Sequence, residues 1–300
     1  MLNHNGYLYK DHPCFCEEKS KKYSRIHLPV AYDCNIQCNY CNRKYDCINE
    51  SRPGVTSRIL TPEDACELFL RARSMMENLS VVGFAGPGDA LANFENVKKT
   101  VNLIKIILQS RHAETSSASQ PLKQNNNNDI LFCLSTNGLL LPDYAEDIIN
   151  IGITHLTVTI NAVDKAFIPK IYEKFHYKGE ELSPEDAAEI LIQNQLSGLK
   201  KLSSAGLICK VNILCLEGIN ENHIEKVVKT AKEYGAFMTN ITGLIPAKGS
   251  KLENAVPIDN KKLMEIRKKC SVHIKQMYHC RQCRADAIGL LGQDIFDSQI

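Results

Sequence analysis

The sequence predicts an α/β protein built around a parallel sheet. Short apolar segments alternate with longer amphipathic ones about six times, two amphipathic segments open with a helix-capping sequence, and polar residues follow several apolar segments directly. In a barrel built this way, functional residues gather at the carboxyl ends of the strands. A barrel of about six βα units and an open doubly wound sheet both fit, because periodicity alone does not separate them.

Each element is expected from its local pattern. The expected strands cover residues 25–31, 80–85, 130–135, 155–160, 207–215 and 236–242. The expected helices cover residues 62–78, 94–109, 143–150, 184–204, 221–234 and 260–275. Thr61 and Ser183 are each followed by proline and then, three residues after the cap, by an acid, which is the pattern of a helix start.

Composition excludes several classes of protein. The chain has 300 residues, 44% of them hydrophobic, and a formal net charge of +2. It can therefore bury a sizeable core, and its charge gives no reason to expect a nucleic acid or an anionic membrane as partner. No apolar stretch resembles a signal peptide or a membrane span. We therefore expect a soluble, cytoplasmic protein.

The cysteines give the main indication of function. Six of the 13 lie between Cys14 and Cys47, and an intracellular chain with clustered cysteines is more often a metal binder than a disulfide scaffold. Cys34, Cys38 and Cys41 form a C-x3-C-x2-C triad. Three thiolates hold three irons of a [4Fe–4S] cluster and leave the fourth open to substrate. A structural zinc site, which usually has four ligands, and disulfides are the alternatives.

The triad resembles that of the radical S-adenosylmethionine (SAM) enzymes. In those enzymes the open iron chelates the amino acid part of SAM, and the reduced cluster cleaves the sulfonium to give a 5′-deoxyadenosyl radical. The resemblance implies a partial (β/α)6 TIM-like barrel, here with cysteine-rich N- and C-terminal extensions.

A longer stretch, residues 34–54, closely resembles the NifB family of nitrogenase cofactor maturases. Further segments agree: residues 12–14, 82–89, 133–138, 157–164 and 279–287. The resemblance implies that two [4Fe–4S] clusters are fused into an eight-iron core, with a carbide from the SAM methyl group and a sulfur from a sulfite-like source. It also implies partners: an Fe–S cluster donor, nitrogenase assembly scaffold or carrier proteins, and an electron donor such as ferredoxin.

The resemblance suggests three parts of the chain. Residues 1–24 would be an N-terminal cluster-ligand extension, residues 25–258 the radical SAM core, and residues 259–300 a C-terminal helix and cluster-ligand tail. The polar segment 112–129, with four consecutive asparagines, is expected to be disordered. Cys16 and Ala90 depart from the family pattern. Because the chain stops soon after Asp294, we expect a stand-alone form without a NifX-like domain.

The resemblance implies ligands for three clusters. Cys34, Cys38 and Cys41 would hold the cluster that cleaves SAM. A sparse second set would hold the two precursor clusters: His12, Cys14, Cys47, Cys133, Cys280 and Cys283. Few and exchangeable ligands suit this task, because irons locked by four thiolates per cluster could not easily reorganise into one core.

A SAM site is implied at the strand ends. Its expected residues are Tyr40, Gly86, Gly88, Asp89, Ser135, Thr136, Asn137, Thr159 and Asn161. Glycine in the turn 86–89 lets backbone carbonyls approach the amino group of SAM closely. Glu50 would be a labile oxygen ligand or a proton acceptor, because removing hydrogens from a bound methyl group needs a base.

Several of these residues also have ordinary structural interpretations. Tyr40 could simply pack in its loop, Cys280 and Cys283 could form half of a zinc site, and Glu50 could be a surface carboxylate paired with Arg43 or Arg52. Cys47 and Cys133 could be buried apolar cysteines. His27 is expected to be a core histidine. Four further cysteines are expected in the core: Cys66, Cys209, Cys215 and Cys270.

Two other functions remain open. A non-catalytic iron–sulfur carrier would need neither an open-iron triad nor a SAM-binding turn. A radical SAM enzyme acting on a peptide or small molecule would use the extra cysteines for auxiliary electron-transfer clusters, but would not explain why those ligands look too few for closed clusters.

Overall fold

Six parallel strands form the middle of one sheet in the computed structural model, which describes residues 12–116 and 130–295. They are β1 (Ser24–His27), β3 (Leu79–Phe84), β4 (Leu131–Thr136), β5 (His155–Thr159), β8 (Ile208–Cys215) and β9 (Met238–Gly243). They lie side by side in chain order, all parallel. A doubly wound sheet would reverse this order at a switch point. The uninterrupted order is that of a partial barrel, which confirms the predicted α/β barrel.

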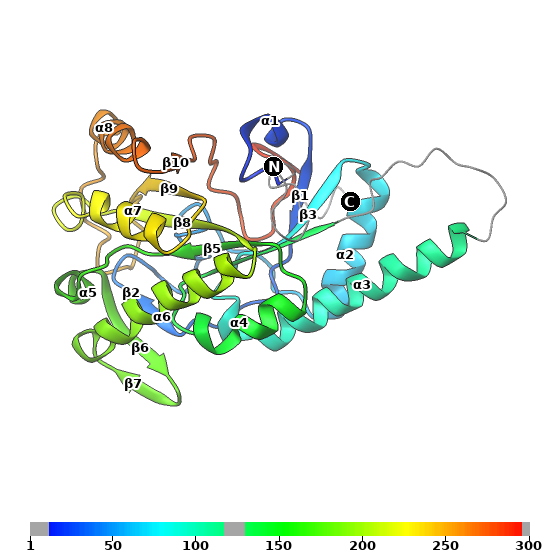
Figure 1. Cartoon of the computed structure of the whole chain (residues 1–300), viewed down its shortest axis with the longest axis horizontal. Coiled ribbons are helices and arrows are strands. Elements are labelled where there is room, and N and C mark those ends of the chain that lie inside the picture. Colours follow the sequence, from blue (N-terminus) through cyan, green and yellow to red (C-terminus); the bar gives the residue numbers. More distant parts are fainter. Residues whose placement is uncertain (1–11, 117–129, 296–300) are drawn as a thin grey trace.

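Helices follow the strands and cover the outer face of the sheet (Figure 1). They are α2 (Pro62–Met75), α3 (Phe94–Ser116), α4 (Leu141–Asn150), α6 (Pro184–Ser204), α7 (Ile224–Glu233) and α8 (Asn260–Ser271). The side-chain oxygens of Thr61 and Ser183 accept the backbone N–H groups of Asp64 and Asp186. The two predicted capping sequences are therefore confirmed.

Several predicted boundaries were wrong. The first strand ends at His27 rather than at residue 31, and α2 ends at Met75. Helix α3 continues to Ser116, so the start of the segment expected to be disordered is helical. The rest of that segment, residues 117–129, lies outside the described residues. The last helix ends at Ser271, because the chain then turns into a short strand, β10 (Lys275–Gln276).

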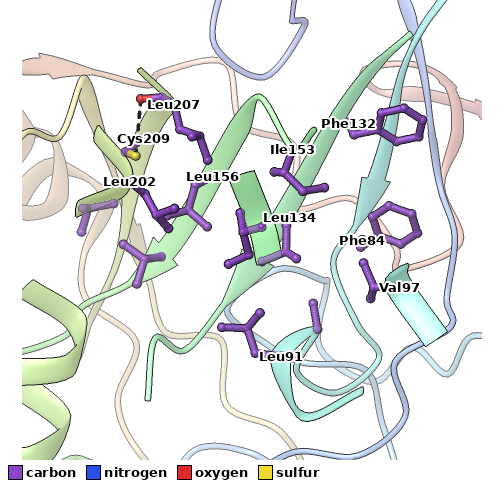
Figure 2. Close-up of a cluster of buried hydrophobic side chains, with 14 of the residues drawn as sticks. Phe84, Leu91, Val97, Phe132, Leu134, Ile153, Leu156, Leu202, Leu207 and Cys209 are labelled. Atoms are coloured by element: carbon purple, nitrogen blue, oxygen red, sulfur yellow. Dashed lines mark hydrogen bonds between the residues drawn. The ribbon is translucent and has the colours of Figure 1, made fainter. Parts of the chain in front are cut away.

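The two faces of the strands differ because successive side chains point to opposite sides. On the outer face, Phe132, Leu134 and Leu156 pack with helix residues such as Leu202 in an apolar core (Figure 2). Cys66, Cys209, Cys215 and Cys270 belong to this core, as predicted. On the inner face, Cys133, Thr157 and Asn212 stand beside a cavity. The apolar outer face therefore packs against the helices, and the polar inner face presents its side chains to the cavity.

The C-terminal segment extends the sheet at both edges. Strand β10 pairs in parallel with β9, whereas β11 (Ile288–Leu290) pairs antiparallel with β1 and with β12 (Gln293–Ile295). Near it, the N-terminal segment forms a short helix, α1 (Glu17–Ser20) (Figure 1). The predicted division into extension, core and tail stays a prediction, but the tail is paired to the core along two strands.

A second, small sheet lies beside the triad loop. It contains β2 (Ile36–Cys38), β6 (Tyr172–Tyr177) and β7 (Glu180–Leu182), in that antiparallel order. The short elements η2 (Leu91–Asn93), η3 (Lys165–Phe167) and α5 (Ile168–Ile171) complete the described fold. None of these was predicted, because elements of three to six residues carry too little periodicity. None of the helices in the described ranges could span a membrane.

Candidate functional site

Two adjacent cavities occupy the inner side of the partial barrel. The first, here the triad cavity, lies at the carboxyl ends of β3, β4 and β5 and has about 470 Å³ of empty space, open solvent at its mouth included. The second, here the tail cavity, runs along the inner faces of the strands to the C-terminal segment and has about 630 Å³ of such space. Asn49, Glu50 and Ser135 line both. The two cavities therefore share a wall.

All three triad cysteines line the triad cavity. Hydrogen bonds within the loop fix its conformation. Cys41 N–H donates to the Cys38 carbonyl at 3.1 Å, and the side chain of Gln37 donates from Nε2 to the Cys38 and Cys41 carbonyls at 3.1 and 3.0 Å. Strand β2, which carries Cys38, pairs with β6. The three thiols are therefore held around one space by local hydrogen bonds.

Burial keeps these thiols protonated until a metal binds. It raises the pKa of Cys34 to about 12 and that of Cys38 well above its ordinary value. Arg43 opposes the shift at Cys41, whose pKa burial also raises. Thiols bind metals as thiolates, so loading this cavity must release protons.

Cys47 lies with the triad rather than with the other expected precursor-cluster ligands. It lines the triad cavity, and its backbone N–H donates to the Pro87 carbonyl at 2.9 Å. Burial, with Cys41 and Cys34 nearby, raises its pKa well above the ordinary value. The structure thus brings four thiols to the triad cavity.

The glycine turn packs directly on the triad loop. A Cβ on Gly88 would lie 2.2 Å from the Asp33 carbonyl oxygen, so only glycine fits there. Gly88 N–H and Asp89 N–H donate to the Ala31 and Asp33 carbonyls at 2.6 and 2.8 Å. Gly88 and Asp89 line the triad cavity; Gly86 is not part of its wall.

Asp89 braces the ends of β3 and β4. Its carboxylate accepts from Leu91 N, from Thr136 Oγ1 and from Asn137 N, the last at 2.6 Å. Burial raises its pKa, and these hydrogen bonds oppose the shift. The carboxylate therefore holds the strand ends together as well as facing the cavity.

The other expected SAM residues separate into two groups. Ser135, Thr136, Asn137 and Thr159 line the triad cavity together with Tyr40. Asn161 does not line either cavity: it is fully buried, donates from Nδ2 to Tyr40 Oη at 2.9 Å, and accepts from Leu214 N at 2.8 Å. Its amide therefore holds the Tyr40 hydroxyl from outside the cavity.

Five expected precursor-cluster ligands meet in the tail cavity. They come from distant parts of the chain: His12, Cys14, Cys133, Cys280 and Cys283. Burial raises the pKa of Cys14 to about 12 and raises that of Cys133 as well. Within the described ranges, no three or more His, Cys, Asp or Glu side chains are grouped closely enough to hold a single metal ion.

The two histidines at this cavity both use Nδ1 for a backbone contact, but they differ in whether Nε2 carries the proton. Nδ1 of His12 accepts the Cys14 backbone N–H at 3.1 Å, so the neutral ring carries its proton on Nε2, which has no protein partner among the described residues. Nδ1 of His27 lies 3.1 Å from the Arg284 carbonyl oxygen, so it is the donor and Nε2 keeps a lone pair. His27, expected in the core, therefore lines this cavity with an unprotonated Nε2, the form of the ring that can bind a metal.

Glu50 stands in the shared wall. Its Oε1 accepts from Asn212 Nδ2 at 3.0 Å, and burial raises its pKa to about 7. Arg43 and Arg52, the expected ion-pair partners, have other contacts: Arg43 donates to the Pro87 carbonyl, and Arg52 lies 3.8 Å from Asp294. Glu50 is therefore a cavity residue.

Sequence reasoning missed two buried cations. Arg25 on β1 donates to Cys283 Sγ at 3.0 Å and pairs with Asp294. Lys210 on β8 lines the tail cavity. A charged residue inside an apolar strand was the available signal in both cases.

The residues fit an open-iron cluster with a small organic ligand. Four thiols line the triad cavity, three of them from the triad loop. The rest of its wall carries hydroxyl, amide, charged and backbone groups, with no room for a side chain at Gly88. A cluster held by the three thiols of the triad loop alone leaves one iron to a ligand that is not a thiolate.

Known proteins resemble the chain in sequence. The Radical SAM superfamily model matches residues 28–231. The FeMo cofactor biosynthesis protein NifB of Bradyrhizobium diazoefficiens is 43% identical over 289 residues, which is 95% of this chain and 54% of that protein. The protein of the same name from Klebsiella pneumoniae is 42% identical over 94% of this chain and 57% of its own. The chain thus spans little more than half the length of these relatives.

Solved structures resemble it in fold alone. Streptococcus suis SuiB bound to S-adenosylmethionine has a TM-score of 0.57 at 11% identity, over 84% of this chain and 49% of that one. Methylornithine synthase (PylB) has a TM-score of 0.55 at 13% identity, over 89% and 67%.

Proposed function

We propose that this chain, which belongs to the Radical SAM superfamily and is 43% identical to a NifB protein over 95% of its own length, is a maturase for the nitrogenase cofactor. It would join two [4Fe–4S] substrate clusters into an eight-iron precursor, with a carbide from the SAM methyl group and an added sulfur. The observation that carries this proposal is the pair of cavities with a shared wall, one lined by the triad and the other by a sparse ligand set.

The triad cavity would hold the cofactors. A [4Fe–4S] cluster on Cys34, Cys38 and Cys41 would supply the reductive cleavage of SAM. The chain itself binds and orients: Gly88 brings its backbone against the cavity, and Ser135, Asn137 and Thr159 offer hydrogen-bonding groups for ribose and carboxylate. Tyr40, held by Asn161, closes one side and limits the access of water.

The tail cavity would hold the substrate clusters. It presents four thiols and two histidines, fewer groups than two closed four-cysteine clusters require. Irons without a fixed protein ligand are free to exchange partners when two clusters merge. Glu50, in the shared wall with a pKa of about 7, is placed to accept the protons lost from the methyl group.

Isotope labelling tests the proposal. Anaerobic incubation with methyl-labelled SAM, dithionite and sulfite should put the label into the acid-extractable cluster fraction, and should form both S-adenosylhomocysteine and 5′-deoxyadenosine. The reconstituted chain should hold about twelve irons, from three four-iron clusters. Label absent from the cluster fraction, with only 5′-deoxyadenosine formed, would exclude the maturase.

One observation favours a second candidate. The four thiols of the tail cavity, Cys14, Cys133, Cys280 and Cys283, would suffice for one closed four-cysteine cluster. A radical SAM enzyme with such an auxiliary cluster, acting on a peptide or small molecule, would hold about eight irons. Iron content and the fate of the label separate the two candidates.

The pathway implies partners. We propose that an Fe–S cluster donor, a ferredoxin-like electron donor and scaffold or carrier proteins of nitrogenase assembly act with this chain. Pull-down of the loaded chain with each candidate, compared with the iron-free chain, would test whether contact depends on the clusters.

A further inference from the structure

Lys210 is a buried cation in the middle of an apolar strand. All eight residues of β8 are buried, and Lys210 is 6% exposed. Its ammonium group lies 3.9 Å from Met277 Sδ and 5.1 Å from the centre of the Phe15 ring. Within residues 12–116 and 130–295, no carboxylate lies within ion-pair distance of it; Glu50 lines the same cavity, and the charge of Lys210 opposes the rise of the Glu50 pKa, but the two form no ion pair. Burying a charge without a counter-ion is costly, so the position needs an explanation.

The tail cavity is where this charge acts. Lys210 lines it together with Cys14 and Cys133. Its charge opposes the burial that raises the pKa of both thiols, and Arg25 has the same effect on Cys283 and, more weakly than Lys210, on Cys14. Two buried cations therefore act on the thiols of this cavity: Lys210, which lines it with Cys14 and Cys133, and Arg25, which donates to Cys283.

We propose that Lys210 is the counter-cation of the substrate cluster bound at Cys14 and Cys133. An iron–sulfur cluster on thiolates is an anion, and its sulfides accept hydrogen bonds from an ammonium group. The bound cluster then supplies the negative counter-charge that the Lys210 ammonium lacks in the iron-free chain. This role rests on the proposed function, because it requires a cluster in the tail cavity.

Lys210 should destabilise the iron-free chain and stabilise the bound cluster in the loaded chain. In the iron-free chain an unpaired ammonium opposes folding, so methionine, of similar length, should be better tolerated there. In the loaded chain the ammonium stabilises the reduced, more negative cluster and raises its reduction potential. A lysine with a merely structural role would stabilise both states alike.

The experiment uses the full chain with Cys34, Cys38 and Cys41 replaced by alanine, so that only tail-cavity clusters contribute signals. Lys210→Met should raise the thermal midpoint of the iron-free chain. After anaerobic reconstitution it should lower the midpoint potential followed by EPR, and release iron to a chelator roughly tenfold faster, as expected for losing a charged hydrogen bond. Lys210→Arg should keep the potential close to that of the parent.

Lys275→Met is the matched control. Lys275 donates to the Phe15 carbonyl at 3.2 Å but is exposed and outside the tail cavity. It should change neither potential nor iron release. Unchanged potential and release in a fully loaded Lys210→Met chain would overturn the role of Lys210 and leave the proposed function standing. A parent chain that holds no iron would overturn both.

Discussion

The two cavities differ in how the chain builds them. The triad cavity takes three of its four thiols from one loop, Cys34 to Cys41, and that loop is fixed by hydrogen bonds between near neighbours. The tail cavity takes its ligands from both ends of the chain and from β4. A site made by a loop depends on local geometry, whereas a site made by the fold depends on every contact that closes it. The following experiments test this difference.

The largest effect is expected from replacing Cys34, Cys38 and Cys41 together with alanine. SAM cleavage should be lost completely, because no other group in the triad cavity replaces three thiolates. Iron in the tail cavity should remain, since its ligands come from other elements. 5′-Deoxyadenosine formation and iron content are the measurements, and residual 5′-deoxyadenosine would refute the triad assignment.

Replacing Cys280 and Cys283 with alanine should have the opposite result. The triad cluster should still form and cleave SAM, while iron content falls by about four per chain and no eight-iron product appears. Cys16→Ala is the control, because Cys16 lines neither cavity and should leave iron content unchanged. If the double variant keeps all its iron, the C-terminal pair is structural.

Replacing Arg25 tests whether the tail cavity depends on the pairing of β11 with β1. Its guanidinium is fully buried, pairs with Asp294 and donates to the Gly289 and Leu290 carbonyls of β11. Arg25→Gln should destabilise the iron-free chain by about 3–5 kcal/mol, the usual cost of breaking a buried ion pair. Tail-cavity iron should be lost before triad iron.

Denaturant unfolding measures this effect, and Arg52→Gln is its control. Arg52 also approaches Asp294, at 3.8 Å, but is 55% exposed, so its loss should cost less than about 1 kcal/mol. Equal effects of the two substitutions would show that burial of Arg25 is not what holds the tail.

The smallest effect is expected far from both cavities. Hydrogen bonds from Lys269, Lys229 and His273 lower the pKa of Glu225 to about 2, from an ordinary value of 4.5. This group stabilises the contact of α7 with α8 fully above about pH 4.5, and the contribution is lost as the pH falls toward 2. Glu225→Gln should remove that part of the acid dependence, seen in thermal midpoints between pH 2 and 6.

The same substitution should leave both cavities unchanged in iron content. A loss of iron from Glu225→Gln would mean that the outer helices and the cavities are more tightly coupled than their separation by the sheet suggests.

The sequence predicted what depends on local pattern. Six strands and six helices follow from periodicity and capping, and the triad follows from its spacing. The order of the strands, which separates a barrel from a doubly wound sheet, depends on long-range pairing and became visible only in the fold. The same holds for β11, whose three residues carry no strand signal until they meet β1.

Within the site, the sequence predicted which residues take part better than it predicted the role of each. Tyr40 and Asn161 were both expected to touch SAM, yet Asn161 holds Tyr40 from behind. Cys47 was expected with the tail ligands but lies in the triad cavity. Such differences come from which face of a strand or loop a side chain occupies, and one residue of register decides that.

The pairing of β1 with β11 also sets an order in time. During synthesis β1 and the triad loop leave the ribosome first, and domains begin to fold from the N-terminal side. The partners of Arg25, which are Cys283, the carbonyls of β11 and Asp294, emerge after all six parallel strands. A nascent chain can therefore form the triad pocket early, whereas the chamber for the second set of thiols exists only once β11 and β12 have been translated and added to the sheet.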